Sequence, residues 1–202
     1  MTQFGAAPPP RVNPQVDMTP PAVPARRTIA LVGLMGVGKS SIGRRLAMAL
    51  GLPFKDADAE IEAAAGRSIS EIFSDYGEAT FRDGERRVIA RLLEEPPHVL
   101  ATGGGAFAQP DTRALIKAKA ISVWLKADLE VLARRVARRD HRPLLTGKDP
   151  MEVLEAHVRD RYPAFETADV VVETGDSPHH VAVDAIIKAL AAHAAAKPGL
   201  AP

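Results

Sequence analysis

The chain has 202 residues, a length that suits one α/β domain with a sizeable hydrophobic core. Its 26 basic and 25 acidic side chains leave a net charge of +1, and only 4% of residues are aromatic, which argues against a general nucleic-acid-binding surface. The absence of cysteine excludes disulfides, zinc–thiolate sites and cysteine-ligated iron–sulfur clusters, and no apolar run approaches the ~20 residues of a membrane-spanning helix.

The first 26 residues differ in composition from the rest of the chain. They contain seven prolines among small and polar residues, without the apolar stretch of a secretory signal. We expect residues 1–26 to be a disordered, proline-rich tail, in which Met18 could be the true start. A polyproline II ligand for some partner is the alternative interpretation. The predicted folded domain spans residues 27–197, and residues 198–202 form a second disordered tail.

A β-prone run at residues 28–32 leads into a glycine-rich loop and then into a helical pattern. The P-loop template G-x-x-x-x-G-K-[ST] is filled by Gly33, Gly38, Lys39 and Ser40. Glycines let backbone N–H groups point at phosphate oxygens, the lysine reaches the β- and γ-phosphates, and the serine hydroxyl can bind Mg²⁺. A plain glycine-rich turn is the alternative, but the flanking strand and helix favour a nucleotide site. The expected ATP contacts are Gly36, Val37, Gly38, Lys39, Ser40 and Ser41.

Two acidic residues follow the next expected elements. A helix is predicted at 39–50, and the short apolar run at 52–54 is a candidate second strand, followed by Asp56 and Asp58. Because ligands bind at the carboxyl ends of strands in parallel α/β sheets, these acids are placed to hold a metal ion and a substrate. The alternative is a solvated acidic cap on the helix that begins near residue 59.

The middle of the chain offers an arginine and three consecutive glycines as candidate site residues. Two helical units are predicted between residues 66 and 93, and Arg82 lies on the second, where a simple surface arginine is the alternative. Residues 99–102 have the pattern of a buried strand, and it ends at the glycines 103–105. Glycines at a strand end allow the backbone to approach a ligand closely, although a flexible turn fits them as well.

The remaining elements complete an alternating pattern. A strand at 120–125 and a helix at 129–138 are followed by a basic loop at 138–149, which contains Arg142 and is typical of a mobile lid that folds over phosphates. A further helix from 150 to about 162, a strand at 169–174 and an alanine-rich helix at 178–196 end the domain. Five strands alternating with helices predict a three-layer, doubly wound and mostly parallel α/β sheet, which with the loop at residues 33–41 is a P-loop fold.

Six motifs along the domain form a specific set. They are the P-loop, Asp56-Ala57-Asp58, Phe81-Arg82, Thr102-Gly103-Gly104-Gly105, Arg142-Pro143-Leu144-Leu145 and Arg161-x-Pro163. In this order and spacing they resemble the motifs of the shikimate kinases, and the likeness extends from about residue 28 to residue 190. The resemblance implies transfer of phosphate from ATP to the 3-hydroxyl of shikimate, with Mg²⁺ as cofactor, giving shikimate 3-phosphate and ADP in chorismate and aromatic amino acid biosynthesis.

The resemblance also assigns the acceptor side of the site. Asp58 would contact the ring hydroxyls and accept the proton of the attacking one. Arg82 and Arg161 would grip the substrate carboxylate. Gly104, between Gly103 and Gly105, would present its amide to the ring hydroxyls.

On the nucleotide side, the resemblance implies that Ser40 binds Mg²⁺ directly and that Asp56 acts through metal-bound water. Arg142 would reach across the phosphates from the lid, and with Lys39 and Asp58 it makes up the expected catalytic set. The expected position of Arg135 is against the adenine, whereas the loop Asp176-Ser177-Pro178 matches the family's adenine-side loop in position but not in composition.

Other functions fit parts of this pattern. A gluconate-type or nucleoside monophosphate kinase could use the same scaffold, because two arginines can bind a phosphate as well as a carboxylate. A non-catalytic nucleotide-binding scaffold would keep the P-loop without needing both acids. A GTPase-like switch requires an N-K-x-D element, and the one asparagine of the chain is Asn13, in the tail. We expect a cytoplasmic monomer that binds shikimate and ATP and has neither nucleic acid nor membrane as a partner.

Overall fold

The structure, a computed structural model, describes residues 27–137 and 149–196. Both predicted tails and nearly all of the predicted lid, with Arg142, lie outside the described residues. In chain order the elements are β1 (Thr28–Val32), α1 (Lys39–Leu50), β2 (Phe54–Asp56), α2 (Ala57–Ala65), α3 (Ile69–Leu92), β3 (Val99–Ala101), the 3₁₀ turn η1 (Ala106–Ala108), α4 (Pro110–Lys119), β4 (Ala120–Lys126), α5 (Leu129–Ala137), α6 (Pro150–Phe165), β5 (Val170–Glu173) and α7 (His179–Ala196).

The described strands form one parallel sheet in the order β2-β3-β1-β4-β5. β1 lies at its centre and pairs with β3 on one side and β4 on the other. All five residues of β1 are buried, as expected for a strand that is covered on both faces. Because the strands are parallel, the loops after β1, β2 and β3 leave the sheet at the same edge. The predicted doubly wound α/β sheet of five strands is therefore confirmed.

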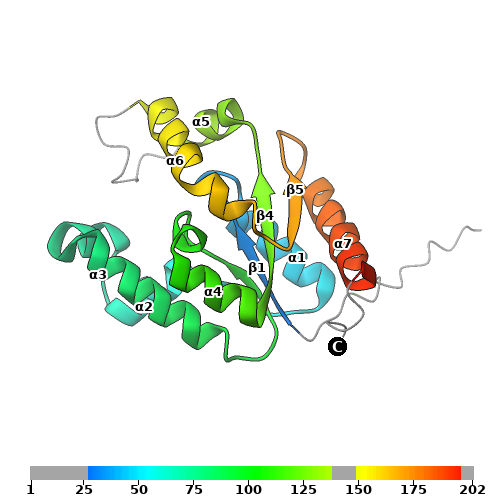
Figure 1. The fold of residues 1–202 in the computed structure, drawn as a ribbon, viewed down its shortest axis with the longest axis horizontal. Helices are drawn as coiled ribbons and strands as arrows, with labels where there is room; N and C mark the ends of the chain where they lie inside the picture. Colours follow the sequence, from blue (N-terminus) through cyan, green and yellow to red (C-terminus); the bar gives the residue numbers. More distant parts are fainter. Residues whose placement is uncertain (1–26, 138–148, 197–202) are drawn as a thin grey trace, which may run out of the picture.

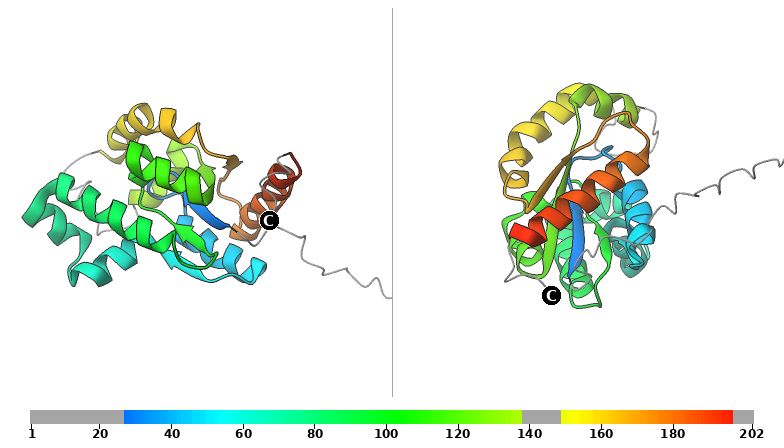
Figure 2. Two further views of the ribbon diagram at one scale, coloured as in Figure 1. Left: turned by 60° about the horizontal axis from the view of Figure 1, so that its bottom comes forward. Right: turned by 90° about the vertical axis from the view of Figure 1, so that its right-hand side faces the viewer.

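Helices cover both faces of the sheet and complete the three layers. α1 and α7 pack against each other on one face, while α4 and α6 lie on the other, with the long α3 alongside α4 (Figure 1, Figure 2). α2 and α3 extend from the side of the molecule opposite to α7 (Figure 1). These two helices carry the predicted acceptor residues, Asp58 on α2 and Arg82 on α3.

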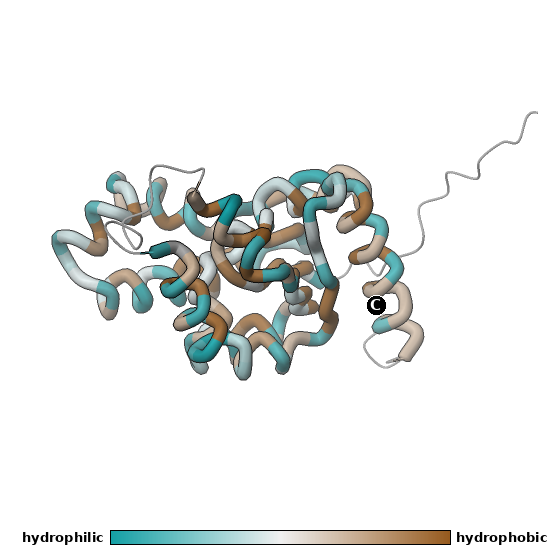
Figure 3. Tube along the Cα trace, turned by 90° about the horizontal axis from the view of Figure 1, so that it is seen from above, coloured by the Kyte–Doolittle hydropathy of each residue, from teal (hydrophilic) through white to brown (hydrophobic). Residues whose placement is uncertain are grey.

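The core lies between these layers. Leu31, Leu100 and Leu125 from the sheet are fully buried, and so are the aromatic rings of Phe107 and Phe165, whose centroids are 6.3 Å apart. Along the helices, hydrophobic and hydrophilic positions alternate, as expected when one side of each helix is buried (Figure 3). Within the described ranges there is no helix with the length and apolar character needed to cross a membrane.

Three predicted boundaries were wrong, each for a physical reason. β2 spans residues 54–56 rather than 52–54, because Pro53 has no N–H and contributes only its carbonyl, which accepts from Val99 N at 2.9 Å. α2 begins at Ala57, since the Asp56 carboxylate accepts from the backbone N–H of Asp58 at 3.1 Å and so caps the helix. α6 continues through Pro163 to Phe165, whose ring packs in the core.

The two helical units predicted between residues 66 and 93 are continuous in α3, with a kink at Gly77. Gly77 has φ +78° and ψ 172°, a conformation that is essentially restricted to glycine. Glu78 therefore opens a new helical run, and the rings of Phe73 and Phe81 meet across the kink with centroids 4.6 Å apart. The kink divides α3 into a short outer half and a long inner half that carries Arg82.

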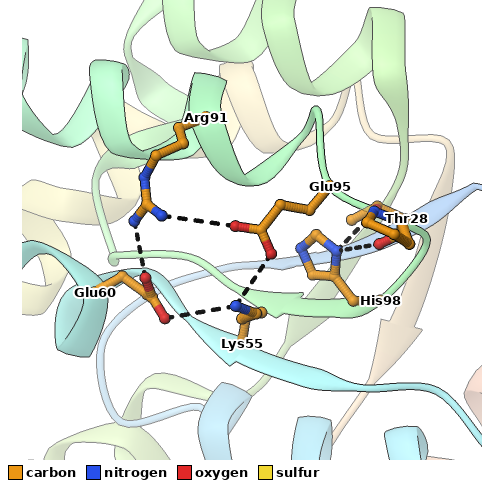
Figure 4. Close-up of polar contacts among 7 residues, drawn as sticks. Thr28, Lys55, Glu60, Arg91, Glu95 and His98 are labelled. Carbon is orange, nitrogen blue, oxygen red and sulfur yellow. Dashed lines mark hydrogen bonds and ion pairs between the residues drawn. The ribbon is translucent and has the colours of Figure 1, made fainter.

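A ring of ion pairs ties α2 and the end of α3 to β2 (Figure 4). Lys55 lies 3.8 Å from Glu60 and 3.1 Å from Glu95, and Arg91 lies 2.8 Å from Glu60 and 3.6 Å from Glu95. Next to it, the buried ring of His98 contacts the Pro96 carbonyl through Nδ1 at 2.9 Å. Lys55 precedes Asp56, so the network fixes the strand that carries a predicted site residue.

We expect Lys55→Met to lower stability near neutral pH and to have less effect in acid. The hydrogen bond from Lys55 holds the pKa of the Glu95 carboxyl below its ordinary value of 4.5. The stabilisation is therefore present above about pH 4.5 and is lost as the pH falls through the lower folded-state pKa. Calorimetric Tm values should differ between variant and wild type at neutral pH and converge in acid. Lys188→Met, at an exposed position of α7, is the control, and a Tm difference that is the same at both pH values would contradict the assignment.

Candidate active site

A cleft of about 390 Å³ opens where β1, β2 and β3 end. The predicted site residues that line it are Gly36, Gly38, Lys39, Ser40, Ser41, Asp56, Asp58, Arg82, Gly103, Gly104, Gly105 and Arg161. Val37 and Arg135 line a second, smaller cavity, and Arg142 lies outside the described residues. Phe73, Phe81, Glu62 and Glu85 also line the cleft and were not predicted. Segments far apart in the sequence thus meet at one site.

The P-loop, residues 33–38, joins β1 to α1. Gly38 precedes α1 with φ +97°, a left-handed conformation that side chains disfavour. Lys39 Nζ donates to the carbonyl oxygens of Gly33 and Leu34, at 2.8 and 3.0 Å, which holds the ammonium across the loop. The first turn of α1 has no acidic residue, and glycine offers no side-chain cap, so the helix N-terminus keeps its positive character. This arrangement suits the binding of phosphate groups.

Ser40 and Asp56 bring a hydroxyl and a carboxylate together at the floor of the cleft. Ser40 Oγ donates to Asp56 Oδ2 at 2.6 Å, while Asp56 Oδ1 accepts from the backbone N–H of Asp58. The cap interpretation of Asp56 is therefore confirmed, because one carboxylate oxygen caps α2, while the other oxygen contacts the first turn of α1. The two oxygens form the kind of hard donor pair that suits Mg²⁺.

Arg82 and Glu85 form a buried ion pair in the cleft wall. Arg82 Nη1 donates to Glu85 Oε2 at 2.7 Å, and Glu85 is completely buried. Burial raises the pKa of the Glu85 carboxyl, against the lowering effect of Arg82. Burial alone would lower the pKa of Arg82, but the carboxylates of Glu85 and Glu78 more than offset it, and the pKa is raised. Glu85 Oε1 has no hydrogen-bond partner and lies against the glycines of the cleft wall.

Glu85 was missed by the sequence analysis, although a signal was present. The buried stripe of the inner half of α3 contains Phe81, Glu85, Ile89 and Leu92, at helical spacing. An acid inside such a stripe is rarely found without a partner, and Arg82 stands three residues before it. The pair could have been predicted from this spacing.

The neighbours of Gly103 and Gly105 leave no room for a side chain at either position. A Cβ on Gly103 would lie 2.4 Å from Glu85 Oε1 and 3.0 Å from Asp58 Oδ1, and one on Gly105 would lie 2.7 Å from Arg82 Nη2. Contacts under 3.0 Å are too short for a Cβ, so side chains here would displace the charged groups. The segment is thus a close-fitting wall, and the flexible-turn interpretation does not describe its role.

Arg161 reaches the same wall from α6. Its Nη1 donates to the Gly104 carbonyl at 3.1 Å. Burial and the nearby charge of Arg82 lower the pKa of Arg161, because each disfavours a second guanidinium charge in this space. An anionic ligand between the two guanidinium groups would relieve this repulsion, so this part of the cleft suits an anion.

Comparisons with known proteins decide the family. The shikimate kinase family model matches residues 35–191. The shikimate kinase of Caulobacter vibrioides is 72% identical over 164 residues, which cover 81% of this chain and 82% of that protein. The chain belongs to the shikimate kinase family.

Solved structures agree with this membership. A shikimate kinase from Acinetobacter baumannii, in complex with shikimate, superposes with a TM-score of 0.79 and 37% identity, over 83% of this chain and 94% of that one. A gluconokinase from Sinorhizobium meliloti has a TM-score of 0.61 and 21% identity, over 89% and 99% of the two chains, which shows a shared fold alone.

In this shikimate kinase family member, a second cavity of about 80 Å³ lies beside the start of α7. It is lined by Val37, Arg135, Gly175 and His179, among others, and Arg135 Nη2 donates to the Gly175 carbonyl. Burial and the charges of Arg45 and Arg135 lower the pKa of His179. Val37 and Arg135 both line this cavity. Its position next to the P-loop is compatible with one end of a nucleotide whose phosphates lie at that loop.

His157 lies one helical turn before Arg161 on α6. Its Nδ1 is buried without a hydrogen-bond partner, and burial, together with the charge of Arg161, lowers its pKa to about 4 from an ordinary value of 6.5. Between these two values the unfolded chain binds a proton that the folded protein does not, so stability falls as the pH drops through this window.

We expect His157→Gln to remove this acid sensitivity, because glutamine takes up no proton. Unfolding free energies from urea denaturation, at several pH values between about 7 and 4, should fall less steeply for the variant than for wild type. His180→Gln, at an exposed position of α7, should keep the wild-type slope. Identical slopes in His157→Gln and wild type would refute the assignment.

Proposed function

We propose that this protein transfers the γ-phosphoryl group of ATP to the 3-hydroxyl of shikimate, giving shikimate 3-phosphate and ADP for chorismate and aromatic amino acid biosynthesis. The observation that carries the proposal is that a P-loop, two arginines and Asp58 line one cleft. The family membership and the shikimate bound in the Acinetobacter baumannii enzyme support the identity of the acceptor. We further propose that the protein acts as a monomer in the cytoplasm.

On the acceptor side, we assign the substrate carboxylate to Arg82 and Arg161. Guanidinium groups bind carboxylates through paired N–H donors, and two of them from separate helices fix the orientation of a small acid. The backbone of Gly104 forms the wall beside them. These contacts leave the ring hydroxyls turned toward Asp58.

On the nucleotide side, we assign the phosphates to the loop of residues 36–41 and the adenine end to the cavity of Val37 and Arg135. Lys39 and the N-terminus of α1 supply positive charge where the γ-phosphate is transferred. The proposed role of Arg142, reaching over the phosphates, stays a prediction from the family resemblance.

Ser40 and Asp56 are the residues that would hold Mg²⁺. Their oxygen atoms already meet at 2.6 Å, and this ion prefers oxygen ligands. Within the described ranges no three His, Cys, Asp or Glu side chains gather as a metal cage, which agrees with an ion held partly by nucleotide phosphates. When bound, the ion supplies charge neutralisation at the β- and γ-phosphate oxygens.

Asp58 is the residue that we assign to the attacking hydroxyl. It lies in the first turn of α2, with its carboxylate against Gly103 in the cleft wall. In this role it orients the substrate oxygen and accepts its proton as the new O–P bond forms and the bond from the γ-phosphorus to ADP breaks. Positioning and charge neutralisation supply the rest of the catalysis.

The proposal is tested by a coupled ADP-release assay with shikimate, gluconate and a nucleoside monophosphate as acceptors. Turnover with shikimate alone is the expected result. Faster turnover of gluconate or of the nucleoside monophosphate would contradict the proposal and would indicate a gluconate-type or a nucleoside monophosphate kinase. Binding of ATP without transfer to any acceptor would make it a nucleotide-binding scaffold.

We expect Asp58→Asn to reduce kcat by about 10²-fold or more, because the amide keeps the shape of the carboxylate but accepts no proton. The apparent KM for ATP should change little, since Asp58 is assigned to the acceptor side. Steady-state kinetics with shikimate and Mg-ATP measure both quantities. Near-normal kcat in the purified, folded variant would remove the general-base role.

A further inference from the structure

All three guanidinium nitrogens of Arg82 donate to carboxylates of its own helix. Nε and Nη2 donate to Glu78 Oε1, at 3.2 and 3.0 Å, and Nη1 donates to Glu85 Oε2 at 2.7 Å. Helix spacing sets both ion pairs, because Glu78 is four residues before Arg82 and Glu85 is three residues after it. The arginine is therefore held between two acids rather than by one.

The two glutamates that contact Arg82 differ in their exposure to solvent. Glu85 is completely buried and lines the cleft. The side chain of Glu78 is 62% exposed and is not among the residues that line the cleft. Glu78 thus engages the Nε and Nη2 side of the guanidinium from outside the substrate space, and an acceptor need not displace it.

The kink at Gly77 creates the position of Glu78. Because Gly77 leaves helical geometry, Glu78 stands in the first turn of the inner half of α3, where a carboxylate is favoured by the helix dipole. The Phe73–Phe81 contact bridges the kink and keeps the two halves of α3 together. The position of Glu78 is consequently fixed by the helix backbone and does not depend on a loop.

The backbone of Gly105 fixes the guanidinium from a third direction. A Cβ there would lie 2.7 Å from Nη2, 3.0 Å from Cζ and 3.1 Å from Nη1 of Arg82, so the flat group lies against this glycine. With Glu78 outside and Glu85 inside, the guanidinium has little freedom to rotate. Its remaining N–H groups are left for a ligand that it shares with Arg161.

We propose that Glu78 is a positioning residue, which sets the orientation of Arg82 so that the guanidinium presents its remaining N–H groups to the carboxylate of the acceptor. This inference rests on the proposed function. Without Glu78, the freed N–H groups of Arg82 turn toward the unpartnered Glu85 Oε1 and form a two-bond pair inside the cleft. Arg82 is then less available to the substrate, while the nucleotide side is unchanged.

The test is a double-mutant cycle with Glu78→Gln and Arg82→Ala, read as KM and kcat for shikimate and KM for ATP. Glu78→Gln should raise the KM for shikimate about fivefold, with kcat and the KM for ATP close to wild type. In the Arg82→Ala background the same substitution should change nothing further, because Glu78 acts through the arginine. Glu78→Gln should also leave binding of the uncharged carboxamide analogue of shikimate unchanged, measured by calorimetry.

Asp83→Asn is the matched control, since Asp83 is also exposed on α3 and pairs with Arg86 and Arg87 at 2.8 and 2.9 Å. It should lose a comparable surface pair without a change in the KM for shikimate. A wild-type KM in Glu78→Gln, a lowered KM, an equal rise in Asp83→Asn or an additive effect in the double variant would each overturn the inference. Failure of the wild-type enzyme to phosphorylate shikimate would instead overturn the proposed function, so the two failures are distinguishable.

Discussion

The cleft wall to which we assign the acceptor depends on one buried ion pair, Arg82 with Glu85. A carboxylate removed from water is tolerated only when it is paired, and such a pair adds little stability compared with apolar residues of the same size. Its presence in the apolar stripe of α3 is therefore explained by what it holds in place. The same pair explains the glycines at 103 and 105, because side chains at these two positions would collide with the two charged groups.

Much of the fold and half of the site could be predicted because their signals are local. The P-loop, its strand and its helix are adjacent in sequence, and β1 is a continuous apolar run, as parallel sheets require. The topology then follows from the alternation of strands and helices. It brings Asp58 and the glycines 103–105 into one cleft, because parallel strands end at a common edge, whereas Arg161, inside α6, was assigned to the site by the family resemblance alone.

The features that could not be predicted depend on packing. The helix that begins at Pro150 was expected to reach only about Tyr162, but it continues through Pro163, because the burial of Phe165 outweighs the lost helical hydrogen bond. Asp56 could be assigned to either a cap or the cleft, and only the placement of α1 beside β2 shows that its two oxygens serve both. Glu78 was not predicted, although it stands four residues before Arg82, because exposed glutamates at this spacing are common and the kink at Gly77 is a feature of the folded chain.

The charges around the two guanidinium groups bear on the choice of acceptor. Arg82 and Arg161 alone would suit a dianionic phosphate, as in nucleoside monophosphates. Here Glu78, Glu85 and Asp58 surround them, so a dianion would add excess negative charge to a partly buried site, whereas a monocarboxylate adds a single charge. Gluconate also carries one carboxylate, but the cleft wall next to these groups contains Phe73, Phe81 and Ile69. Such a wall suits the apolar face of a carbocyclic ring better than an open chain with a hydroxyl on every carbon.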